Sequence, residues 1–314
     1  MPQRFGMNAS RRMDSRQLRY FDAVARERSF HKAAERLRIS QPALSRHIQR
    51  LEEEFGTPLL VRHTRGIDLT SEGEILLRHA TSILRQFEAA RDDVLAHAVE
   101  PTGTVSIGAP PTISAILFGD LTGDVARKAP NVSLTLCEGI THYLTDWLET
   151  GQLDVAVVGN PPPLHSIATE HLLDEEVYLV GCRSTAFPKE NLLPEALVDL
   201  PLILATRMET IGSWLEERLG AVGERLNVRY RVESPAIALD LVRRSLGLAV
   251  LPRSAIWQKL NDGQIHTALI RQVTLSRYIA LPQDRPRTKA MEIVLGSIRE
   301  RLAHFDGLGA FRSI

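Results

Sequence analysis

The chain has 314 residues, 44% of them hydrophobic and 24% charged, a composition typical of a globular protein of about two domains. No apolar run reaches the ~18 residues that span a bilayer, and no apolar signal-peptide segment follows Met1. The two cysteines, Cys137 and Cys182, lie in no metal-binding pattern. We therefore expect a cytoplasmic protein without membrane segments, metal sites or disulfides. The formal net charge is zero, yet residues 1–70 contain 14 Lys and Arg against 8 Asp and Glu, and this excess suggests a polyanionic partner for the N-terminal part.

A polar leader precedes the first predicted helix. Residues 1–13 show no apolar periodicity, so they are expected to be disordered. Translation has three alternative starts in this leader, at Met1, Met7 and Met13.

Two short helices are predicted next. Asp14 can cap the first, and Ser29 can cap the second, which runs to Leu37. The small residues Ala33 and Ala34 would allow the second helix to approach its neighbours closely. The expected apolar face of the first helix contains Leu18, Phe21, Val24 and Ala25.

A third helix is predicted in the stretch SQPALSRHIQRLEEEFG. Ser40 stands at the cap position, Pro42 lies in the first turn, where a missing amide proton costs no hydrogen bond, and Gly56 ends the helix. Apolar residues at steps of 4, 3 and 4 form the expected buried stripe: Leu44, Ile48, Leu51 and Phe55.

The opposite side of this third helix is polar. Arg can pair with guanine and Gln with adenine in the major groove, so a helix-turn-helix that reads DNA is one interpretation. The alternative is a solvated face of an unrelated helical bundle. The candidate DNA-contacting residues are Ser40, Gln41, Pro42, Ser45, Arg46 and Gln49.

A basic hairpin follows and favours the DNA-binding interpretation. Two short strands, 59–62 and 67–70, are predicted to flank a turn at His63–Gly66. Arg62 and Arg65 would lie at its tip and reach the DNA backbone or an A·T-rich minor groove, as a wing does.

One long helix is predicted over residues 71–98. Its apolar residues repeat at 4-3-4-3-4, the pattern of a coiled-coil seam, which favours self-association. The alternative is a helix that packs on its own domain. The seam residues are Leu76, Ala80, Ile83, Phe87, Ala90 and Val94.

Beyond Pro101 the predicted strands alternate with helices. Continuous apolar strands between helices are typical of a parallel sheet covered on both faces. Strands are predicted at 104–109, 132–138, 153–159, 176–181, 201–205, 228–233 and 247–252 and near 264–281, with helices ending at Lys128 and Leu148 and starting at Pro235 and near Arg287.

The sequence contains no motif typical of an enzyme. GxSxG, GxGxxG, P-loop and HExxH patterns are all missing, and the ten histidines lack ligand spacing, so we expect a protein that is not an enzyme and needs no cofactor. A solute-binding protein is the alternative class for the α/β part. Cys137 and Cys182 are expected to be buried as small hydrophobic residues, with a redox switch as the alternative.

Residues 29–73 resemble the winged-helix signature of LysR-type transcriptional regulators. The resemblance implies a winged helix-turn-helix at 14–70, a linker and dimerisation helix at 71–100, and a two-lobed α/β effector domain at 104–314 that is similar to periplasmic solute-binding proteins. In this scheme lobe I comprises about 104–163 and 268–314, and lobe II about 164–267. The DNA-reading positions of the family correspond to Gln41, Pro42, Ser45, Arg46 and Arg65.

The resemblance also implies an effector cleft between the lobes. Hydroxyl groups at helix starts would hold a small anionic metabolite there, whereas the alternative role of such residues is simply to cap helices. The implied effector residues are Thr112, Thr141, Asn160, Thr206, Arg207 and Ser234.

The same resemblance implies homodimers, and from them a homotetramer, that bind an interrupted palindrome in double-stranded DNA, and it allows RNA polymerase as a further partner. The stretches TSILRQFEAA, TGQLDVAVVG and EEVYLVG resemble the nitrogen-assimilation-control branch of the family. In that branch the cleft need not respond to a ligand.

Overall fold

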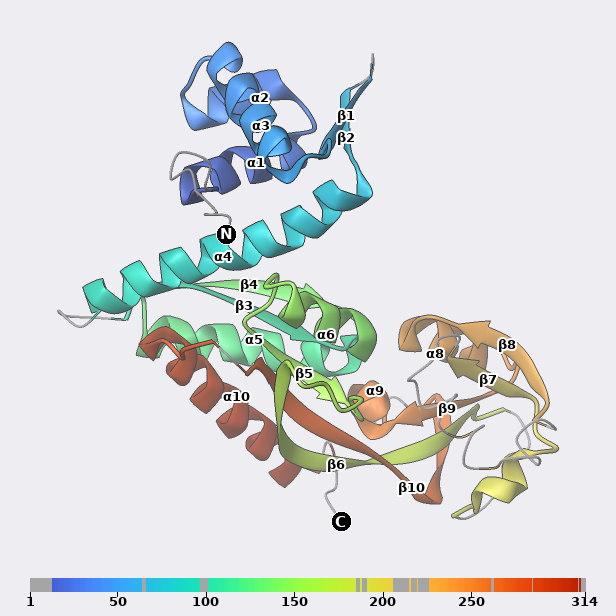
Figure 1. The fold of residues 1–314 in the computed structure, drawn as a ribbon. Helices are drawn as coiled ribbons and strands as arrows, with labels where there is room; N and C mark the ends of the chain where they lie inside the picture. The colour runs from blue at the N-terminus through green and yellow to red at the C-terminus, as the bar shows by residue number, and fades with distance from the viewer. Residues whose placement is uncertain are drawn as a thin grey trace, which may run out of the picture. The chain divides into compact units, whose positions relative to one another are not determined.

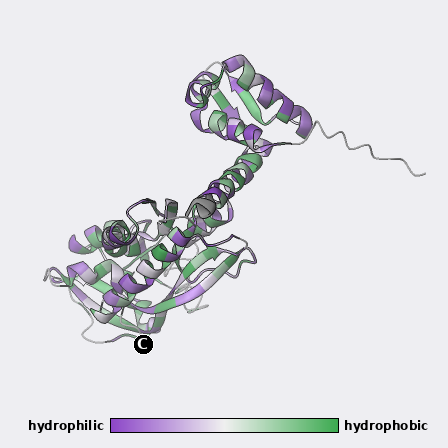
Figure 2. Cartoon of the chain, turned by 90° about the vertical axis from the view of Figure 1, so that its left-hand side faces the viewer, coloured by the Kyte–Doolittle hydropathy of each residue, from purple (hydrophilic) through white to green (hydrophobic). Residues whose placement is uncertain are grey.

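The structure is a computed structural model that describes residues 13–63, 66–96, 101–184, 187, 191–205, 215, 219, 226–260, 263–283, 285–309 and 311 (Figure 1). The chain divides into two compact units, one of Met1–Leu95 with Thr150–Gln152 and one of Ala96–Glu149 with Leu153–Ile314, and each unit is described by itself. Their helices carry hydrophobic and hydrophilic residues on different sides (Figure 2). The predicted leader lies outside the described residues except for Met13, whose side chain packs against the core of the N-terminal unit.

The N-terminal unit begins with three helices, α1 (Ser15–Glu27), α2 (Phe30–Leu37) and α3 (Gln41–Phe55). Asp14 forms the predicted cap of α1, since its side chain accepts from the Gln17 amide at 2.8 Å while the Gln17 side chain accepts from the Asp14 amide. Arg38 (φ 54°) turns the chain from α2 into α3. The core residues of the three helices include Leu18, Phe21, Val24, Ala33, Ala34, Leu44, Ile48 and Leu51.

Two predictions for α3 were wrong in detail. Ser40 stands at the cap position, but its side chain makes no capping hydrogen bond. Phe55 is 46% exposed, because it lies in the last turn, beyond the part of α3 that the other helices cover.

A short antiparallel hairpin follows, formed by β1 (Leu60–His63) and β2 (Gly66–Leu69). Both strands lie within one residue of their predicted bounds. Leu60 and Ile67 are buried in the same core as the helices, and the Ile67 amide donates to the Arg28 carbonyl at 3.2 Å. The hairpin is therefore fixed on the helix-turn-helix.

The long helix α4 (Ser71–Ala96) starts at Thr70, whose hydroxyl accepts from the Gly73 amide at 3.0 Å. A Cβ on Gly73 would lie 2.0 Å from the Leu59 carbonyl oxygen, so only glycine allows this close contact with the hairpin. Arg26 on α1 also donates to Thr81 at 3.2 Å. The first half of α4 is thus an integral part of the N-terminal unit.

The C-terminal unit contains an eight-stranded sheet in the order β4-β3-β5-β10-β6-β9-β7-β8. The strands are β3 (Gly103–Ala109), β4 (Val132–Glu138), β5 (Val155–Gly159), β6 (Ile167–Cys182), β7 (Leu202–Ala205), β8 (Val228–Val232), β9 (Leu248–Pro252) and β10 (Ile265–Pro282). The helices are α5 (Pro111–Lys128), α6 (Thr141–Glu149), α8 (Pro235–Arg243), α9 (Arg253–Ile256) and α10 (Lys289–Gly307), with 3-10 turns η1 (Pro194–Leu197) and η3 (Trp257–Lys259).

The sheet is mixed, whereas the sequence predicted a parallel one. The pairs β3/β4, β3/β5, β7/β8 and β7/β9 are parallel, as predicted. The long strands β6 and β10 instead run antiparallel to each other, and also to β9 and β5 respectively. These two strands cross from one half of the sheet to the other and so connect two lobes (Figure 1).

The chain passes from one lobe to the other within the long strands β6 and β10, and not at the predicted bounds of 163/164 and 267/268. In β6, Leu173 packs in the lobe I core and Val177 in the lobe II core. In β10, Val273 packs in lobe II and Ile279 in lobe I. The crossovers therefore lie about ten residues later than the resemblance implied, because both strands extend beyond the bounds of a single lobe.

Helices α5 and α10 pack together on lobe I. Asp124 on α5 is buried and accepts hydrogen bonds from Arg301 on α10 and from Arg127 on its own helix. No described helix has the length and apolarity needed to cross a membrane, and no cluster of metal-ligating side chains occurs among the described residues.

Candidate nucleic-acid interface and ligand pocket

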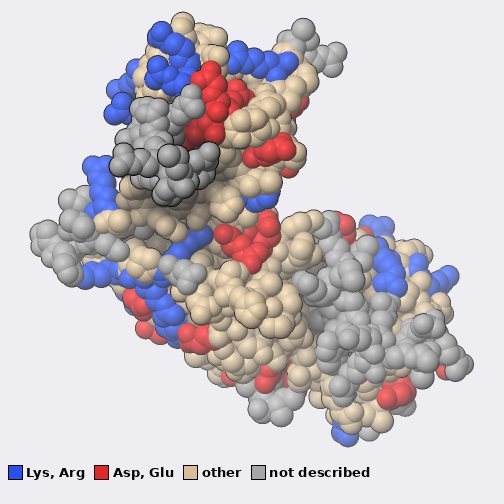
Figure 3. All heavy atoms as spheres, in the orientation of Figure 1, with Lys and Arg blue, Asp and Glu red and all other residues tan. Residues whose placement is uncertain are grey.

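The predicted polar side of α3 lies on the surface of the N-terminal unit. Gln41, Pro42, Arg46 and Gln49 are exposed and Ser45 is half-buried, while the apolar stripe of the same helix is in the core. On the face shown in Figure 3, Lys and Arg side chains gather over the upper part of this unit. A solvent-facing helix with bidentate donors and a positive surround matches the shape and charge of a major groove.

The N-terminus of α3 is also accessible. Since Ser40 supplies no capping hydrogen bond, the first amides of α3 keep their donor capacity within the described part of the chain. Helix N-termini with unpaired amides bind phosphate readily. Ser40 lies beside these amides, and its side chain is exposed.

The structure contradicts the predicted role of Arg62. Its guanidinium turns back onto the helix-turn-helix, where Nη2 donates to Ser45 Oγ at 3.2 Å and Cζ lies 4.4 Å from the centroid of the Phe30 ring. A guanidinium held in this way does not extend from the tip of the hairpin toward flanking DNA. Arg65 lies outside the described residues, so its predicted role stays a prediction.

The predicted seam of α4 separates into two parts. Leu76 and Ala80 are buried in the core of their own unit, and Ile83 packs partly against it. For these residues the alternative interpretation, packing on their own domain, is correct. Phe87 is 53% exposed and Ala90 is exposed, whereas the side chain of Val94 lies outside the described residues.

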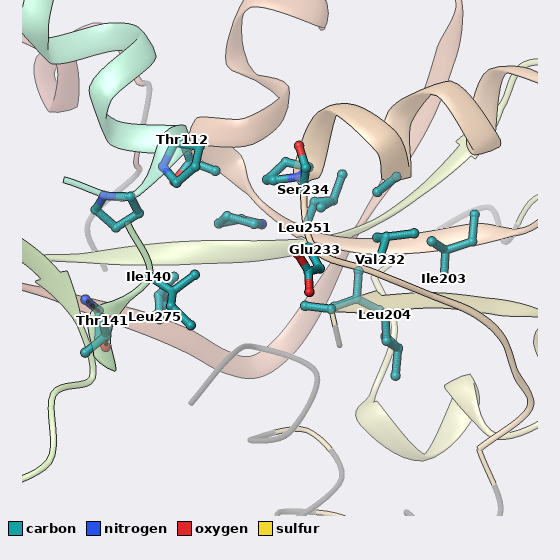
Figure 4. A pocket seen from close by; sticks show the side chains of 18 of the residues that line it. Thr112, Ile140, Thr141, Ile203, Leu204, Val232, Glu233, Ser234, Leu251 and Leu275 are labelled. Atoms are coloured by element: carbon teal, nitrogen blue, oxygen red, sulfur yellow. Dashed lines mark hydrogen bonds between the residues drawn. The ribbon is translucent and has the colours of Figure 1, made fainter. Parts of the chain in front are cut away.

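A pocket of about 150 Å³ lies between the two lobes, where strands of both end (Figure 4). Cavities of this volume accommodate a molecule of roughly the size of benzene. Lobe I contributes Thr112 and Thr141 at the starts of α5 and α6, and lobe II contributes Ser234 at the start of α8 (Figure 4). Much of the remaining lining is apolar: Ile140, Ile203, Leu204, Val232, Leu251 and Leu275.

Two of the implied effector residues are held by the fold. The Thr141 hydroxyl donates to the Gly159 carbonyl at 3.0 Å and accepts from the Gly159 amide at 3.2 Å, so it pins α6 to β5 although it lines the pocket. Asn160 is not a lining residue; its side chain accepts from the Ser276 amide at 3.1 Å and holds β5 against β10. The interpretation of Asn160 as a ligand contact is therefore wrong.

Thr112 and Ser234 line the pocket as the resemblance implied. Ser234 also caps α8 by accepting from the Ala236 amide at 3.2 Å, so both of its interpretations apply. Pro110 and Pro111 remove amide protons at the start of α5, which leaves this helix start fewer donors for an anion. Thr206 and Arg207 lie outside the described residues.

Of the described residues, two charged ones line the pocket, Glu233 and Arg277 on β10, and the sequence predicted neither of them as a pocket residue. The Arg277 side chain is 4% exposed and forms an ion pair with the fully buried Glu175 on β6, with Nη2 to Oε2 at 2.7 Å and Nε to Oε2 at 2.9 Å. Nη2 also donates to Thr112 at 3.3 Å, and Glu175 accepts from the Ser254 amide at 2.5 Å. In the sequence, Arg277 is followed by the apolar run Ile279–Leu281, but β10 also contains Arg271 and Gln272, so no local pattern distinguishes it.

The third nitrogen of Arg277 remains for a ligand. A Cβ added at Gly159 would lie only 3.1 Å from Nη1 of Arg277, so the glycine at this position leaves room for the guanidinium. Among the described residues Nη1 has no hydrogen-bond partner. A buried guanidinium with one unused donor edge attracts a carboxylate or another acceptor.

The prediction that both cysteines are buried as small hydrophobic residues holds in part for Cys137, which packs partly buried against a core cluster of lobe I. Both are free thiols with intermediate exposure. Cys182, in the last position of β6, lies 3.2 Å from Ser184 Oγ. Hydrogen bonds from Ser184, through its hydroxyl and its amide, and from Ser245 lower the pKa of Cys182 to about 7.

Comparison with known proteins agrees with both parts of this geometry. A family model described as "Bacterial regulatory helix-turn-helix protein, lysR family" matches residues 15–74, and one described as "LysR substrate binding domain" matches residues 98–303. The nitrogen assimilation regulatory protein nac of Klebsiella aerogenes is 36% identical over 302 residues, which cover 92% of this chain and 96% of that protein. The transcriptional regulator BbuR of Bordetella bronchiseptica is 30% identical over 81% of this chain and 78% of its own length.

Solved structures of similar proteins have the same overall architecture. Full-length OxyR from Pseudomonas aeruginosa has a TM-score of 0.72 and 30% identity, with 92% of this chain and 98% of that chain covered. Full-length CbnR in complex with its target DNA has a TM-score of 0.67 over 92% of this chain and 100% of that one. At 23% identity the CbnR likeness shows the fold alone.

Proposed function

Since the chain belongs to the LysR family of transcriptional regulators, with a DNA-binding helix-turn-helix and an effector-binding domain, we propose that the exposed side of α3 reads base edges in the major groove. The observation that supports this most directly is that Gln41, Ser45, Arg46 and Gln49 lie opposite the buried residues Leu44, Ile48 and Leu51. Arg46 suits guanine and the glutamines suit adenine. Two such helices in a dimer would read the two half-sites of an interrupted palindrome.

The test begins with a duplex selected from a random-sequence library by the full chain. Arg46→Ala is expected to weaken binding to this duplex by about 1–3 kcal/mol while binding to a scrambled duplex changes little. The matched control is Arg78→Ala, which removes an exposed arginine of α4. Equal weakening on both duplexes would reduce Arg46 to a phosphate contact and contradict the proposal.

Arg65 is proposed as the wing residue that contacts the DNA backbone or minor groove. A phosphate contact of this kind releases a counterion, so Arg65→Ala is expected to flatten the dependence of log K on log salt by about one unit. An unchanged salt slope and affinity would exclude the hairpin from the DNA.

Dimerisation is proposed through the second half of α4, where Phe87 and Ala90 are exposed. An exposed phenylalanine beyond the part of α4 that is buried in its own unit favours contact with a second copy. Pairing of two such dimers would form the tetramer, and RNA polymerase is the proposed partner at the promoter. All of these steps would take place on DNA in the cytoplasm.

The pocket is proposed to bind a small carboxylate with an apolar body. Arg277 offers Nη1 to the carboxylate, and the apolar lining suits a hydrocarbon moiety of about benzene size. Binding would bring the lobes together and change the packing that sets the spacing of the DNA-binding units. A second candidate is control without a ligand, and the two are distinguished by a screen of carboxylates.

A further inference from the structure

Arg62 connects three elements of the N-terminal unit. It belongs to β1, its guanidinium stacks on Phe30 at the start of α2, and it donates to Ser45 on α3. The hairpin that carries Arg62 is itself held by the hydrogen bond from the Ile67 amide to the Arg28 carbonyl. The contact with Ser45 is therefore formed before any DNA binds.

The direction of this hydrogen bond determines what Ser45 can do next. A guanidinium has only donors and stays charged at all physiological pH values, so Ser45 Oγ must be the acceptor. A serine hydroxyl has one proton and two lone pairs, and Arg62 occupies one lone pair. The Ser45 hydroxyl keeps its proton to donate, and Ser45 lies on the same side of α3 as Arg46 and Gln49.

We propose that Arg62 is a positioning residue that makes Ser45 a hydrogen-bond donor to a base edge. The acceptors that the major groove offers are purine N7, guanine O6 and thymine O4, whereas cytosine N4 is a donor and would be disfavoured. This inference rests on the proposed placement of α3 in the major groove, and it assigns Arg62 a part in specificity that differs from a backbone contact.

The physical basis is the restriction of a freely rotating hydroxyl. Without Arg62, the Ser45 hydroxyl can donate or accept and thus adapts to more than one base. With Arg62 in place, the hydroxyl is oriented before binding, so less conformational entropy is lost on the correct site. Arg62 is exposed and Ser45 half-buried, so replacing either by alanine leaves the apolar core of the unit intact.

The test uses the full chain and the selected duplex described above, with Arg62→Ala, Ser45→Ala and the double variant. Each single variant is expected to lose about 3- to 10-fold in affinity, the range of one net hydrogen bond. Because the two residues act through one contact, the double variant should bind within twofold of Ser45→Ala. Binding to a scrambled duplex and the salt slope should stay at parent values.

A base-pair scan of the selected duplex identifies the position that Ser45 reads. The parent should prefer an acceptor at one position of each half-site, and both single variants should relax the preference at that same position. Multiplied losses in the double variant would overturn the inference. So would a salt slope reduced by about one unit in Arg62→Ala, because that is the signature of a phosphate contact.

Arg46→Ala separates this inference from the proposed function. If Arg46→Ala weakens the selected and the scrambled duplex equally, the placement of α3 in the groove fails. If Arg46→Ala lowers affinity only on the selected duplex while Arg62 and Ser45 act independently, the placement holds and the positioning role of Arg62 is wrong.

Discussion

Cys182 is a residue whose acid–base behaviour depends strongly on its neighbours. Hydrogen bonds from Ser184, from Ser245 and from backbone amides favour the thiolate and bring the pKa to about 7, from an ordinary value of 9.0. The folded protein therefore binds fewer protons than the unfolded chain between about pH 7 and 9. The contribution of this group to stability grows as the pH rises through that window and is absent at lower pH.

Alkylation rates provide the check. Cys182 is expected to react with iodoacetamide along a titration curve centred near pH 7, because the thiolate is the nucleophile. Ser184→Ala should move the midpoint upward, since it removes the hydroxyl that lowers the pKa most. Mass spectrometry measures alkylation at each cysteine, and Cys137 in the same protein serves as the internal reference. A Cys182 midpoint near 9 in the parent would contradict the prediction.

The exposed, polar side of a helix was predicted correctly where the residues of that helix alone decided it. The 3.6-residue period separates Arg46 and Gln49 from Leu44 without further information. The pair Arg277–Glu175 was missed because its members are 102 residues apart and meet only through the register of β10 on β6. Thr141 was predicted to line the pocket, but the hydrogen bonds of its hydroxyl to Gly159 on β5 could not be predicted from any local pattern.

At the scale of elements, α4 changes its surroundings along its length. Leu76 is in the core of the N-terminal unit, whereas Phe87 is 53% exposed. We expect Phe87→Glu to weaken the dimer about 10- to 100-fold, because a charge replaces a side chain that the partner would bury. Sedimentation at micromolar concentration measures this change, with thermal unfolding close to that of the parent.

Leu76→Ala is the companion variant on the same helix. It removes a buried side chain from the core of its own unit, so we expect a loss of about 2–5 kcal/mol in the free energy of unfolding of that unit. Dimers that remain folded should associate as the parent does. If Phe87→Glu formed a dimer as tight as the parent, the second half of α4 would not be the interface.

The contact between α5 and α10 depends on Asp124. Hydrogen bonding from Arg301, with added attraction from Arg301 and Arg127, holds the pKa of Asp124 below its usual value. A depressed pKa in the folded state means that the stabilisation is present above about pH 4 and is lost as the pH falls through the lowered pKa. Asp124→Asn should cost about 1.5–3 kcal/mol at pH 7.

Urea unfolding at pH 7 and pH 3 measures this contribution. The difference between Asp124→Asn and the parent should shrink at the lower pH, because the carboxyl group of the unfolded chain is then protonated while the lowered pKa keeps the folded one charged. Asp120→Asn is the matched control on the same helix, because Asp120 is more exposed and lies 3.8 Å from Arg301, a pair of little expected value. A constant difference at both pH values would contradict the assignment.

Most helices and the short parallel strands were predicted within one or two residues. The first half of β6 was not predicted, because residues 169–171 are exposed and polar and give no apolar period, although their backbone pairs with β10. The antiparallel crossover strands were mistaken for parts of a parallel sheet for the same reason. Strand direction depends on distant partners, and an apolar run specifies only that a strand is buried.

At the scale of the whole molecule, the pocket between the lobes is expected to respond to a carboxylate. A panel of small monocarboxylates with apolar bodies should include one that raises the melting temperature of the full chain, since a ligand selective for the folded state stabilises it by about 2.7 kcal/mol at 100 times its Kd. The methyl ester of the same compound should have no effect, because it lacks the charge that Arg277 would bind.

Thr112→Val tests the place of binding. It removes the hydroxyl beside Arg277 and should weaken or abolish the shift, with DNA binding in the absence of ligand unchanged. Thr122→Val is the matched control, since Thr122 lies on the exposed side of the same helix. No shift from any carboxylate, with normal regulation by Thr112→Val in cells, would favour control without a ligand.

The path of the chain through lobe I has a consequence for how the protein is made. The hydrophobic core of the N-terminal unit is complete once residue 96 has been synthesised, because it draws only on residues before that point. Lobe I, by contrast, needs the end of β10 and α10 to cover β3 and α5, so it closes only when synthesis has nearly ended. At 5–20 residues per second the ribosome needs roughly 10–40 s for the intervening stretch. During that interval a nascent chain already carries a folded DNA-reading unit while its sensing domain has yet to form.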